Sequence, residues 1–399
     1  MSIWPEFSLG SLCTVRSGGT PARANPDHFN GDIPWVKIGD MLQGNITDTE
    51  EKITQLGMRN SSAKLFPAGT VLISIFATIG RTAVLEVDAT TNQAIAGLTP
   101  IDAQKLNPAY LRRYLDSIVA TLEGKAQGVA QININSSILK SLPVPLPSLE
   151  YQERVIDILD HIDKLRAKRR AAITLLDDLA RSIFIDLFGD PSRNPKGWPM
   201  KVIGDLLESA SYGTSAKADL AGDLPVLRMN NVTITGSVDL ANLKYMQRDS
   251  VSERYLVYAG DILFNRTNSP ELVGKTAVYR GSDPLAYAGY LVRLRTNKEN
   301  DPEYVSAFLN TGYAKRVLRN MCKSIVGMAN INAREIQGVS IAQPPLKLQQ
   351  KFAALTHKIE SFRHIHRSHL AELDTLFAAV QHRAFRGELQ NDLVEQSKP

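Results

Sequence analysis

The feature that most constrains the fold is an internal repeat that runs through nearly the whole 399-residue chain. Six segments of the first half return in the second half, in the same order and at a nearly constant offset. The pairs are "WPEFSLGSL" and "WPMKVIGDL", "SGGTP" and "SYGTS", "GDIPWVKIGDM" and "GDLPVLRMNNV", "PAGTVLIS" and "YAGDILFN", "IGRTAVL" and "VGKTAVY", and "NPAYL" and "DPEYV". A chain of this length exceeds one ordinary core, so the repeat predicts two copies of one domain.

Each copy has the same internal order. Short β-branched and aromatic runs, cut by Gly, Pro, Asn and Asp, predict strands and turns. A helix is then expected after Asn107 in the first copy and after Asp301 in the second, because each is a good N-cap followed by Pro. A junction follows, "AQININSSILKSLPVPLPSLEYQ" (130–152) and "ANINAREIQGVSIAQPPLKLQ" (329–349). Its prolines lack backbone donors and predict a stiff entry into the next segment.

After each junction, apolar residues recur at alternating spacings of three and four, which predicts a coiled-coil seam. The seam positions are Val155, Ile158, Ile162, Leu165, Arg169, Ala172, Leu176, Leu179 and Ile183, and then Phe352, Leu355, Ile359, Phe362, His366, His369, Leu373, Leu376 and Val380. If the two helices of one chain pack together, chain direction makes them antiparallel and places Arg169 opposite His366. Pairing of these helices between molecules is the alternative.

These patterns predict an α+β protein in which an antiparallel coiled coil separates two homologous globular domains, with approximate two-fold symmetry. The domains are expected at 1–148 and 191–344, the long helices at 149–190 and 345–389, and a tail at 390–399.

Composition limits the function only weakly. The net charge of +5 and the pI near 9.0 allow a polyanionic partner without demonstrating one. The longest apolar run, "VLISIFATIG" (71–80), is about half of a bilayer span, and no secretory signal is visible. A cytoplasmic protein with no membrane partner is therefore expected. Cys13 and Cys322 are too few for a disulfide framework or a cysteine-built zinc site.

Two segments resemble catalytic motifs, but each has a residue that departs from its motif. The "LVGKTAV" segment has Ser269 where a phosphate-binding loop needs its first Gly. The "NPAY" segment resembles an amino-methyltransferase motif, but Ala109 breaks it and an N-cap followed by Pro explains it. Since no catalytic pattern recurs in both copies, a binding protein without catalytic residues or a cofactor of its own is expected.

The long helical segments hold most of the histidines and a basic cluster. His366 and His369 are spaced as metal ligands could be, but a polar layer that fixes helix register is the favoured interpretation, so no metal is predicted. The cluster is either a solvated face or a contact for phosphates or a partner; it comprises Lys164, Arg166, Lys168, Arg169, Arg170, Arg363 and Arg367.

Candidate DNA-binding residues lie in the predicted loops of both copies. Gly-rich turns could bring backbone amides close to phosphates, and Arg, Asn and Gln are efficient readers of guanine and adenine edges. The candidates are Gly18, Gly19, Thr20, Lys37, Arg81, Lys125, Gln127, Gln131 and Asn133 in the first copy, and Gly213, Thr214, Arg228, Asn230, Asn265, Arg266, Asn268, Lys275, Lys323 and Asn330 in the second.

With its paired strands "IPWVKIGDM"/"LPVLRMNNV", "AGTVLIS"/"AGDILFN" and "IGRTAVL"/"VGKTAVY" and its two junctions, the chain resembles the specificity subunit of type I restriction–modification systems. The family junction commonly reads Pro-Pro-Leu-x-Glu-Gln. Here it reads "PSLEYQ" (147–152) and "PPLKLQ" (344–349), so Tyr151 and Leu348 replace the Glu.

The resemblance implies that each globular domain is a target recognition domain that reads one half of a bipartite site in double-stranded DNA. The coiled coil would set the gap between the half-sites and dock two modification subunits, which carry S-adenosylmethionine. Two restriction subunits using ATP and Mg²⁺ would complete the complex. Two alternatives remain: a standalone tandem DNA-binding or coiled-coil adaptor, and a self-sufficient DNA methyltransferase or nuclease.

Overall fold

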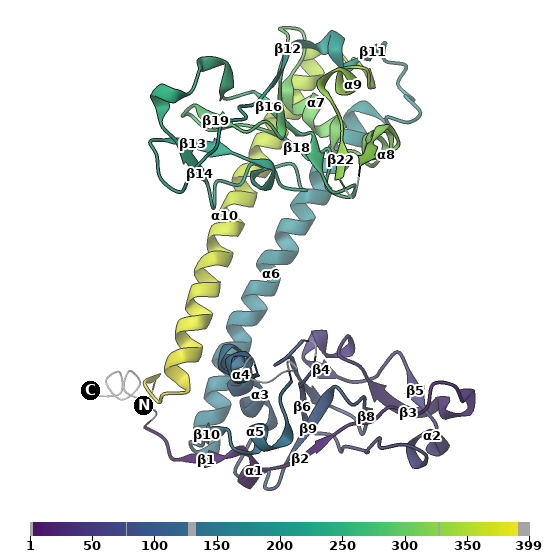
Figure 1. The fold of residues 1–399 in the computed structure, drawn as a ribbon, viewed down its shortest axis with the longest axis vertical. Coiled ribbons are helices and arrows are strands. Elements are labelled where there is room, and N and C mark those ends of the chain that lie inside the picture. The colour runs from purple at the N-terminus through teal and green to yellow at the C-terminus, as the bar shows by residue number, and fades with distance from the viewer. Residues whose placement is uncertain (1–2, 77, 127–132, 326–327, 390–399) are drawn as a thin grey trace. The chain divides into compact units, whose positions relative to one another are not determined.

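The computed structural model describes residues 3–76, 78–126, 133–325 and 328–389. The chain divides into two compact units, and each is described by itself. Unit 1 comprises Met1–Lys168 and His369–Pro399, and unit 2 comprises Arg169–Ser368. Two long helices, α6 (Leu149–Phe188) and α10 (Leu346–Ala384), pass through both units (Figure 1). Each unit therefore contains one globular domain and one end of each helix.

The globular domain of unit 1 is built on a five-stranded sheet of order β2-β9-β6-β7-β4, antiparallel except for the β7–β4 pair. A smaller sheet has the order β5-β3-β8. Helix α3 (Pro108–Ser117) packs against β6 and β7 and buries Tyr110 and Leu111 in the core. The strands are β2 Cys13–Ser17, β3 Phe29–Val36, β4 Asn45–Ile46, β5 Lys52–Ile53, β6 Val71–Ser74, β7 Thr82–Leu85, β8 Thr90–Thr91 and β9 Ile95–Pro100.

The globular domain of unit 2 repeats this plan. Its central sheet has the order β12-β20-β16-β18, matching β2-β9-β6-β7, and helix α7 (Pro302–Leu309) packs on β18. A second sheet has the order β14-β13-β19-β15, and a third β17-β22-β21. The strands are β12 Leu207–Tyr212, β13 Leu224–Leu227, β14 Lys244–Met246, β15 Leu256–Val257, β16 Ile262–Asn265, β17 Thr267–Asn268, β18 Thr276–Val278, β19 Leu285–Tyr287, β20 Leu291–Thr296, β21 Lys323–Ile325 and β22 Met328–Asn330.

The predicted helix starts are confirmed in both domains. The side chain of Asn107 accepts a hydrogen bond from the backbone N–H of Ala109, and Asp301 accepts one from the N–H of Glu303. Pro occupies the first turn of each helix, where its missing N–H costs no hydrogen bond.

Part of each junction forms a three-residue strand that pairs with a strand near the beginning of the same domain. In unit 1, β10 (Pro143–Pro145) pairs with β1 (Glu6–Ser8), and in unit 2, β23 (Ser340–Ala342) pairs with β11 (Met200–Val202). The hydroxyl of Tyr110 donates to the carbonyl of Pro145 at 3.0 Å. The junction is thus held on both sides before the long helix begins.

A buried Gln in the first turn of each long helix fastens that helix to its domain. Gln152 accepts a hydrogen bond from the N–H of Asn107 at 2.9 Å and donates to the carbonyls of Lys105 and Pro147 at 2.8 and 2.9 Å. Gln349 accepts from the N–H of Asp301 at 2.8 Å and donates to the carbonyl of Pro344 at 2.8 Å. Both Gln side chains are fully buried, so these hydrogen bonds form away from water.

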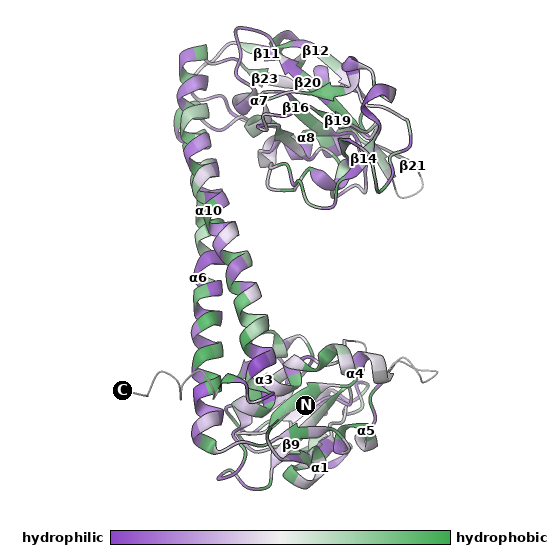
Figure 2. Cartoon of the chain, turned by 90° about the vertical axis from the view of Figure 1, so that its left-hand side faces the viewer, coloured by the Kyte–Doolittle hydropathy of each residue, from purple (hydrophilic) through white to green (hydrophobic). Residues whose placement is uncertain are grey.

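Within each unit the ends of α6 and α10 pack antiparallel. In unit 1, the hydroxyl of Tyr151 at the start of α6 donates to the carbonyl of Ala384 at the end of α10, at 3.1 Å. In unit 2, the rings of Phe184 and Phe188 lie 5.7 and 5.4 Å from that of Phe352. Figure 2 shows hydrophilic and hydrophobic residues along the whole length of both helices, as expected where one face stays exposed.

The heptad pattern is wrong at four seam positions. The exposed fractions of Ile158, Leu179, Phe362 and Leu376 are 40%, 47%, 57% and 48%. The globular domains also pack on the ends of the helices. There they bury a helix face that neighbours the predicted seam. They bury positions outside the predicted seam, Leu159, Phe184 and Phe188.

The helices also end earlier than predicted. Helix α6 ends at Phe188 instead of residue 190, and α10 at Ala384 instead of residue 389. Gly189 (φ 85°) and Gly387 (φ 81°) follow closely in the left-handed conformation that terminates helices and that Gly adopts without strain.

Candidate nucleic-acid interface

The first group of predicted site residues surrounds a short turn that occurs in both domains. This turn follows β3 in unit 1 and β13 in unit 2. In unit 1, Arg81 Nη1 donates to the carbonyl of Ile38 at 3.3 Å. In unit 2, Lys275 Nζ donates to the carbonyl of Met229 at 2.9 Å. The two pairs occupy matching positions of the repeat. The cation next to the central sheet therefore supports the same turn in both domains.

The charge of this turn differs between the domains. Lys37 Nζ lies 2.8 Å from Glu51 Oε1 and 3.4 Å from Glu50 Oε2, and the hydrogen bond that Lys37 donates to Glu51 raises the pKa of Lys37. Its counterpart Arg228 donates instead to the carbonyl of Asn242 at 2.8 Å and has no ion pair among the described residues. Two carboxylates thus offset the positive charge of Lys37 in unit 1, whereas Arg228 has no carboxylate partner among the described residues of unit 2.

A second group of predicted residues comes together on the small sheet β17-β22-β21 of unit 2. Arg266 Nη2 donates to Asn330 Oδ1 at 3.0 Å, and Asn330 Nδ2 donates to the hydroxyl of Thr267 at 3.2 Å. The guanidinium of Arg266 lies 5.0 Å from the ring centre of Tyr212, which is 45% exposed. Asn268 lies on the same sheet, and Lys323 pairs with Asn330 in the strand register. This arrangement offers an arginine, an amide and an aromatic face on one surface.

Tyr212 was missed by the sequence prediction, although the repeat held a signal for it. Tyr212 occupies the position of Gly18, and Arg266 follows β16 where Ile75 follows β6 in unit 1. Asn133 corresponds to Asn330, and it forms a bridge with Phe76. The two domains thus carry different side chains at the same place. Gln127 and Gln131 lie outside the described residues, and Lys125 lies in α4 (Val119–Ala126).

The Gly-rich turns cannot offer their amides to phosphates, contrary to the prediction. The N–H groups of Gly18 and Gly19 donate to the carbonyls of Ile95 and Thr91, and those of Gly213 and Thr214 donate to the carbonyls of Leu291 and Tyr287. A Cβ on Gly18 would lie 2.3 Å from the carbonyl oxygen of Asn92. These glycines allow close packing of backbone segments, and the hydroxyl of Thr20 donates to Gln93.

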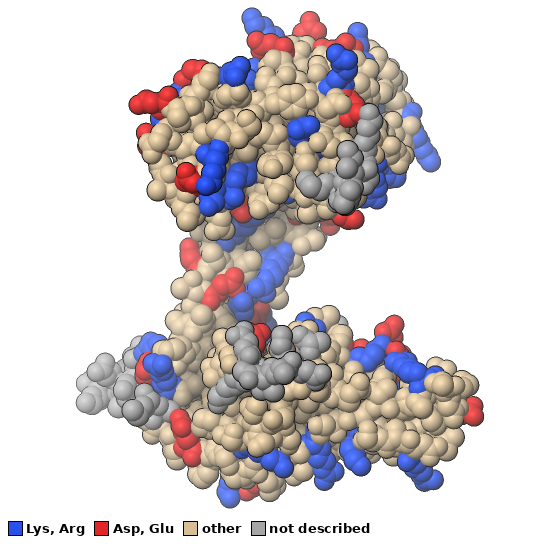
Figure 3. Space-filling view, in the orientation of Figure 1, with Lys and Arg blue, Asp and Glu red and all other residues tan. Residues whose placement is uncertain are grey.

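Asn265 is also wrong as a DNA-contacting candidate, because its side chain is fully buried. By contrast Asn230, after β13, is exposed and has no side-chain hydrogen bond among the described residues. On the face seen in Figure 3, Lys and Arg are interspersed with Asp and Glu over each unit. Individual clusters, more than a uniform basic surface, therefore define the candidate interface.

Arg166 and Arg363 of the predicted basic cluster form ion pairs. Arg166 pairs with Asp163 and Asp374, both at 2.6 Å, and Arg363 pairs with Asp177 at 2.6 Å and with Glu360. Within the described ranges, no group of three His, Cys, Asp or Glu residues could hold a metal ion. Over the same part of the chain, no helix is both long and apolar enough to cross a membrane.

Comparison with known proteins supports this architecture. Residues 1–175 match the family model described as the type I restriction modification DNA specificity domain. The MjaIX specificity subunit of Methanocaldococcus jannaschii is 23% identical over 89% of this chain and 86% of that protein. The HindI specificity subunit of Haemophilus influenzae is 30% identical over 39% of this chain and 36% of its own length. The crystal structure of the type I S subunit from M. genitalium has the same fold, with a TM-score of 0.60, 14% identity and 96% coverage of both chains.

Proposed function

We propose that this chain, whose residues 1–175 match the type I restriction modification DNA specificity domain, is the specificity subunit of a type I restriction–modification system without catalytic residues of its own. Each of its globular domains then reads one half of a bipartite DNA site. The observation that carries the proposal is the repeated domain with diverged side chains at matching positions. Unit 2 has Tyr212, Arg266 and Asn330 where unit 1 has Gly18, Ile75 and Asn133. Two readers with different chemistry recognise two different half-sequences.

In the bound state, the cluster of Arg266, Asn330 and Tyr212 contacts base edges, because Arg pairs with guanine and Asn with adenine in the major groove. Arg228, Lys275 and Asn230 contact the phosphate backbone and position the domain. Unit 1 relies on Asn133 and on the segment that precedes it, because the charge of Lys37 is already neutralised.

The paired helices α6 and α10 set the gap between the half-sites. Two related readers on one face of a duplex favour half-sites about one helical turn, roughly 10 bp, apart, which leaves a gap of about 5–8 bp. Two modification subunits dock along the helices and methylate adenine with their own S-adenosylmethionine, after the base has left the stack. Two restriction subunits, which use ATP and Mg²⁺, complete the complex.

Genome-wide adenine methylation with and without this chain tests the proposal. The expected result is an asymmetric motif of two short sequences separated by a fixed gap, which disappears when the chain is deleted. A continuous motif or a palindrome would contradict the bipartite reading.

Two further measurements separate the alternatives. If the chain works with modification subunits, purification from its native host yields a stable complex with a methyltransferase, whereas a standalone adaptor yields none. Incubation of the purified chain with DNA, S-adenosylmethionine, ATP and Mg²⁺ should give neither methylation nor cleavage. Either product would indicate a self-sufficient enzyme.

A further inference from the structure

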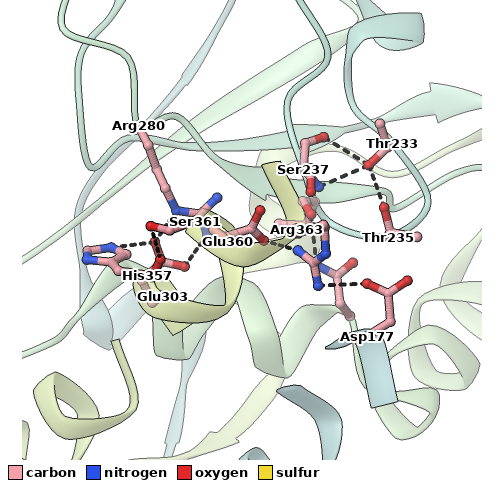
Figure 4. A network of polar contacts seen from close by, with 12 residues as sticks. Asp177, Thr233, Thr235, Ser237, Arg280, Glu303, His357, Glu360, Ser361 and Arg363 are labelled. Carbon is pink, nitrogen blue, oxygen red and sulfur yellow. Dashed lines mark hydrogen bonds and ion pairs between the residues drawn. The ribbon is translucent and has the colours of Figure 1, made fainter. Parts of the chain in front are cut away.

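A cavity of about 540 Å³ lies in unit 2, where α6 and α10 meet α7 and the loop 234–236. Its walls include Phe184, Ile185, Phe352 and the small side chains of Ala180 and Ala307. Figure 4 shows the polar groups beside it: Arg363 reaches Asp177 from α10, and Arg280 faces Glu303 of α7. The volume lies in the range of small-molecule sites.

The same ion-pair arrangement occurs in unit 1, which gives a template for this cavity. In unit 1, Arg166 of α6 pairs with Asp163 on its own helix and with Asp374 of α10. In unit 2, Arg363 of α10 pairs with Glu360 on its own helix and with Asp177 of α6. The residues match one for one in the repeat, so the two arginines make equivalent ion pairs.

Unit 1 places an aromatic ring beside its arginine, whereas unit 2 has small side chains at the matching positions. The guanidinium of Arg166 lies 4.6 Å from the ring centre of Phe377, and that of Arg113 lies 5.7 Å from the same ring. The residues at the matching positions of unit 2 are Ala180 and Ala307. Among the described residues of unit 2, no aromatic ring stacks on Arg363.

Several buried polar atoms of residues that line this cavity have no hydrogen-bond partner among the described residues. They are Nε of Arg363, Oδ1 of Asn310 and Oγ1 of Thr356, and all three residues line the cavity. The Arg363 side chain is only 4% exposed. Buried polar atoms are normally hydrogen-bonded, so this set points to a missing donor and acceptor partner.

The charges of the lining cancel. The lining contains three carboxylates, Asp177, Glu303 and Glu360, and three arginines, and Arg280 donates two hydrogen bonds of 2.6 Å to Glu303. A charged ligand would disturb this balance, whereas a neutral one would not.

We propose that this cavity binds a small, neutral, planar aromatic molecule that carries hydrogen-bonding groups. Its ring stacks on the guanidinium of Arg363, as Phe377 stacks on Arg166, and packs between Phe184 and Phe352. Its polar groups satisfy Asn310 and Thr356. The proposal is independent of how the domains read DNA.

Calorimetric titration of the full chain with indole, 4-methylphenol and adenosine tests the proposal. At least one probe should bind saturably, with one site per chain, and raise the melting temperature. Ala180→Phe places the ring of unit 1 into the cavity and should abolish this binding while the protein stays folded. Ala307→Leu narrows the same cavity from α7 and should also abolish binding. It replaces Ala180→Phe in the test if that variant does not fold.

Two further variants sharpen the test. Phe377→Ala opens the matching space in unit 1 and should add a second site for the same probe. Arg363→Lys keeps the charge but loses the planar face, and should weaken binding about fivefold or more. The proposal is overturned if no probe binds at about 10 mM, the weak end of small-ligand affinities, or if a folded Ala180→Phe or Ala307→Leu variant binds as tightly as the wild type.

Discussion

Nη1 of Arg169 on α6 lies 3.4 Å from Nδ1 of His366 on α10, and these two residues occupy the same position of the repeat. The midpoint of one heptad pattern thus meets the midpoint of the other. On either side of this pair, Arg166 reaches Asp374 and Arg363 reaches Asp177. Polar contacts, and not only apolar packing, therefore join α6 to α10 within each unit.

The Arg363 ion pairs should stabilise unit 2 strongly. Arg363→Ala leaves Asp177 and Glu360 without their cation in a poorly hydrated place, and we expect a loss of about 3 kcal/mol in the free energy of unfolding. Urea denaturation measures it. The control is Arg367→Ala, an exposed arginine one turn further along, which should change stability by less than about 0.5 kcal/mol. Equal effects of the two variants would contradict a role for the ion pairs.

The buried Gln152 should be essential for fastening α6 to its domain. Gln152→Leu keeps the volume but leaves the N–H of Asn107 and the carbonyls of Lys105 and Pro147 without partners. A loss of about 2–4 kcal/mol is expected. Hydrogen exchange at the Asn107 amide should accelerate, whereas the neighbouring exposed change Glu153→Ala should leave it unchanged. Slow exchange in Gln152→Leu would indicate another partner.

Lys315 should make stability depend on alkaline pH. Burial, with a smaller contribution from Lys275, lowers the pKa of Lys315 to about 8 in the folded protein. The unfolded chain then binds more protons between this pKa and the ordinary value near 10.5, so the free energy of unfolding should rise with pH across that window. Lys315→Met should remove this rise. Identical pH profiles of the two proteins would show that the ammonium is well hydrated.

Arg266 should determine part of one half-site only. Arg266→Ala should relax the sequence preference at one base pair, by about 1–3 kcal/mol, and leave the other half-site unchanged. Methylation motifs obtained with each variant report this directly. Arg193→Ala removes an exposed arginine elsewhere in unit 2 and should leave the motif intact. If the sequence preference weakened at both half-sites, Arg266 would contribute to DNA affinity in general and not to the recognition of one base pair.

The long helices should act as a spacer. Insertion of one heptad of seven residues into α6 alone should break the match between the helices and abolish methylation. Matched insertions in α6 and α10 should restore folding and widen the gap of the recognised site. Restored methylation with an unchanged gap would contradict the spacer function.

The sequence by itself determined the repeat, the two helix starts at Asn107 and Asp301, and the two long helices. These features depend on local signals: N-caps, prolines, and the spacing of apolar residues along one helix. The contact of Arg169 with His366 followed from the constant offset between the repeats, since an antiparallel pair brings matching midpoints together.

Only the tertiary structure decided what the individual side chains do. In the folded protein Asn265 is buried, and the backbone amides of Gly18 and Gly213 donate hydrogen bonds within their domains. Tyr212 lies beside Arg266. The tertiary structure also left a cavity beside Ala180, where unit 1 has Phe377. The physical reason is that burial, hydrogen-bond partners and empty volume depend on residues far apart in the chain, and a repeat pattern shows which positions correspond without showing what surrounds them.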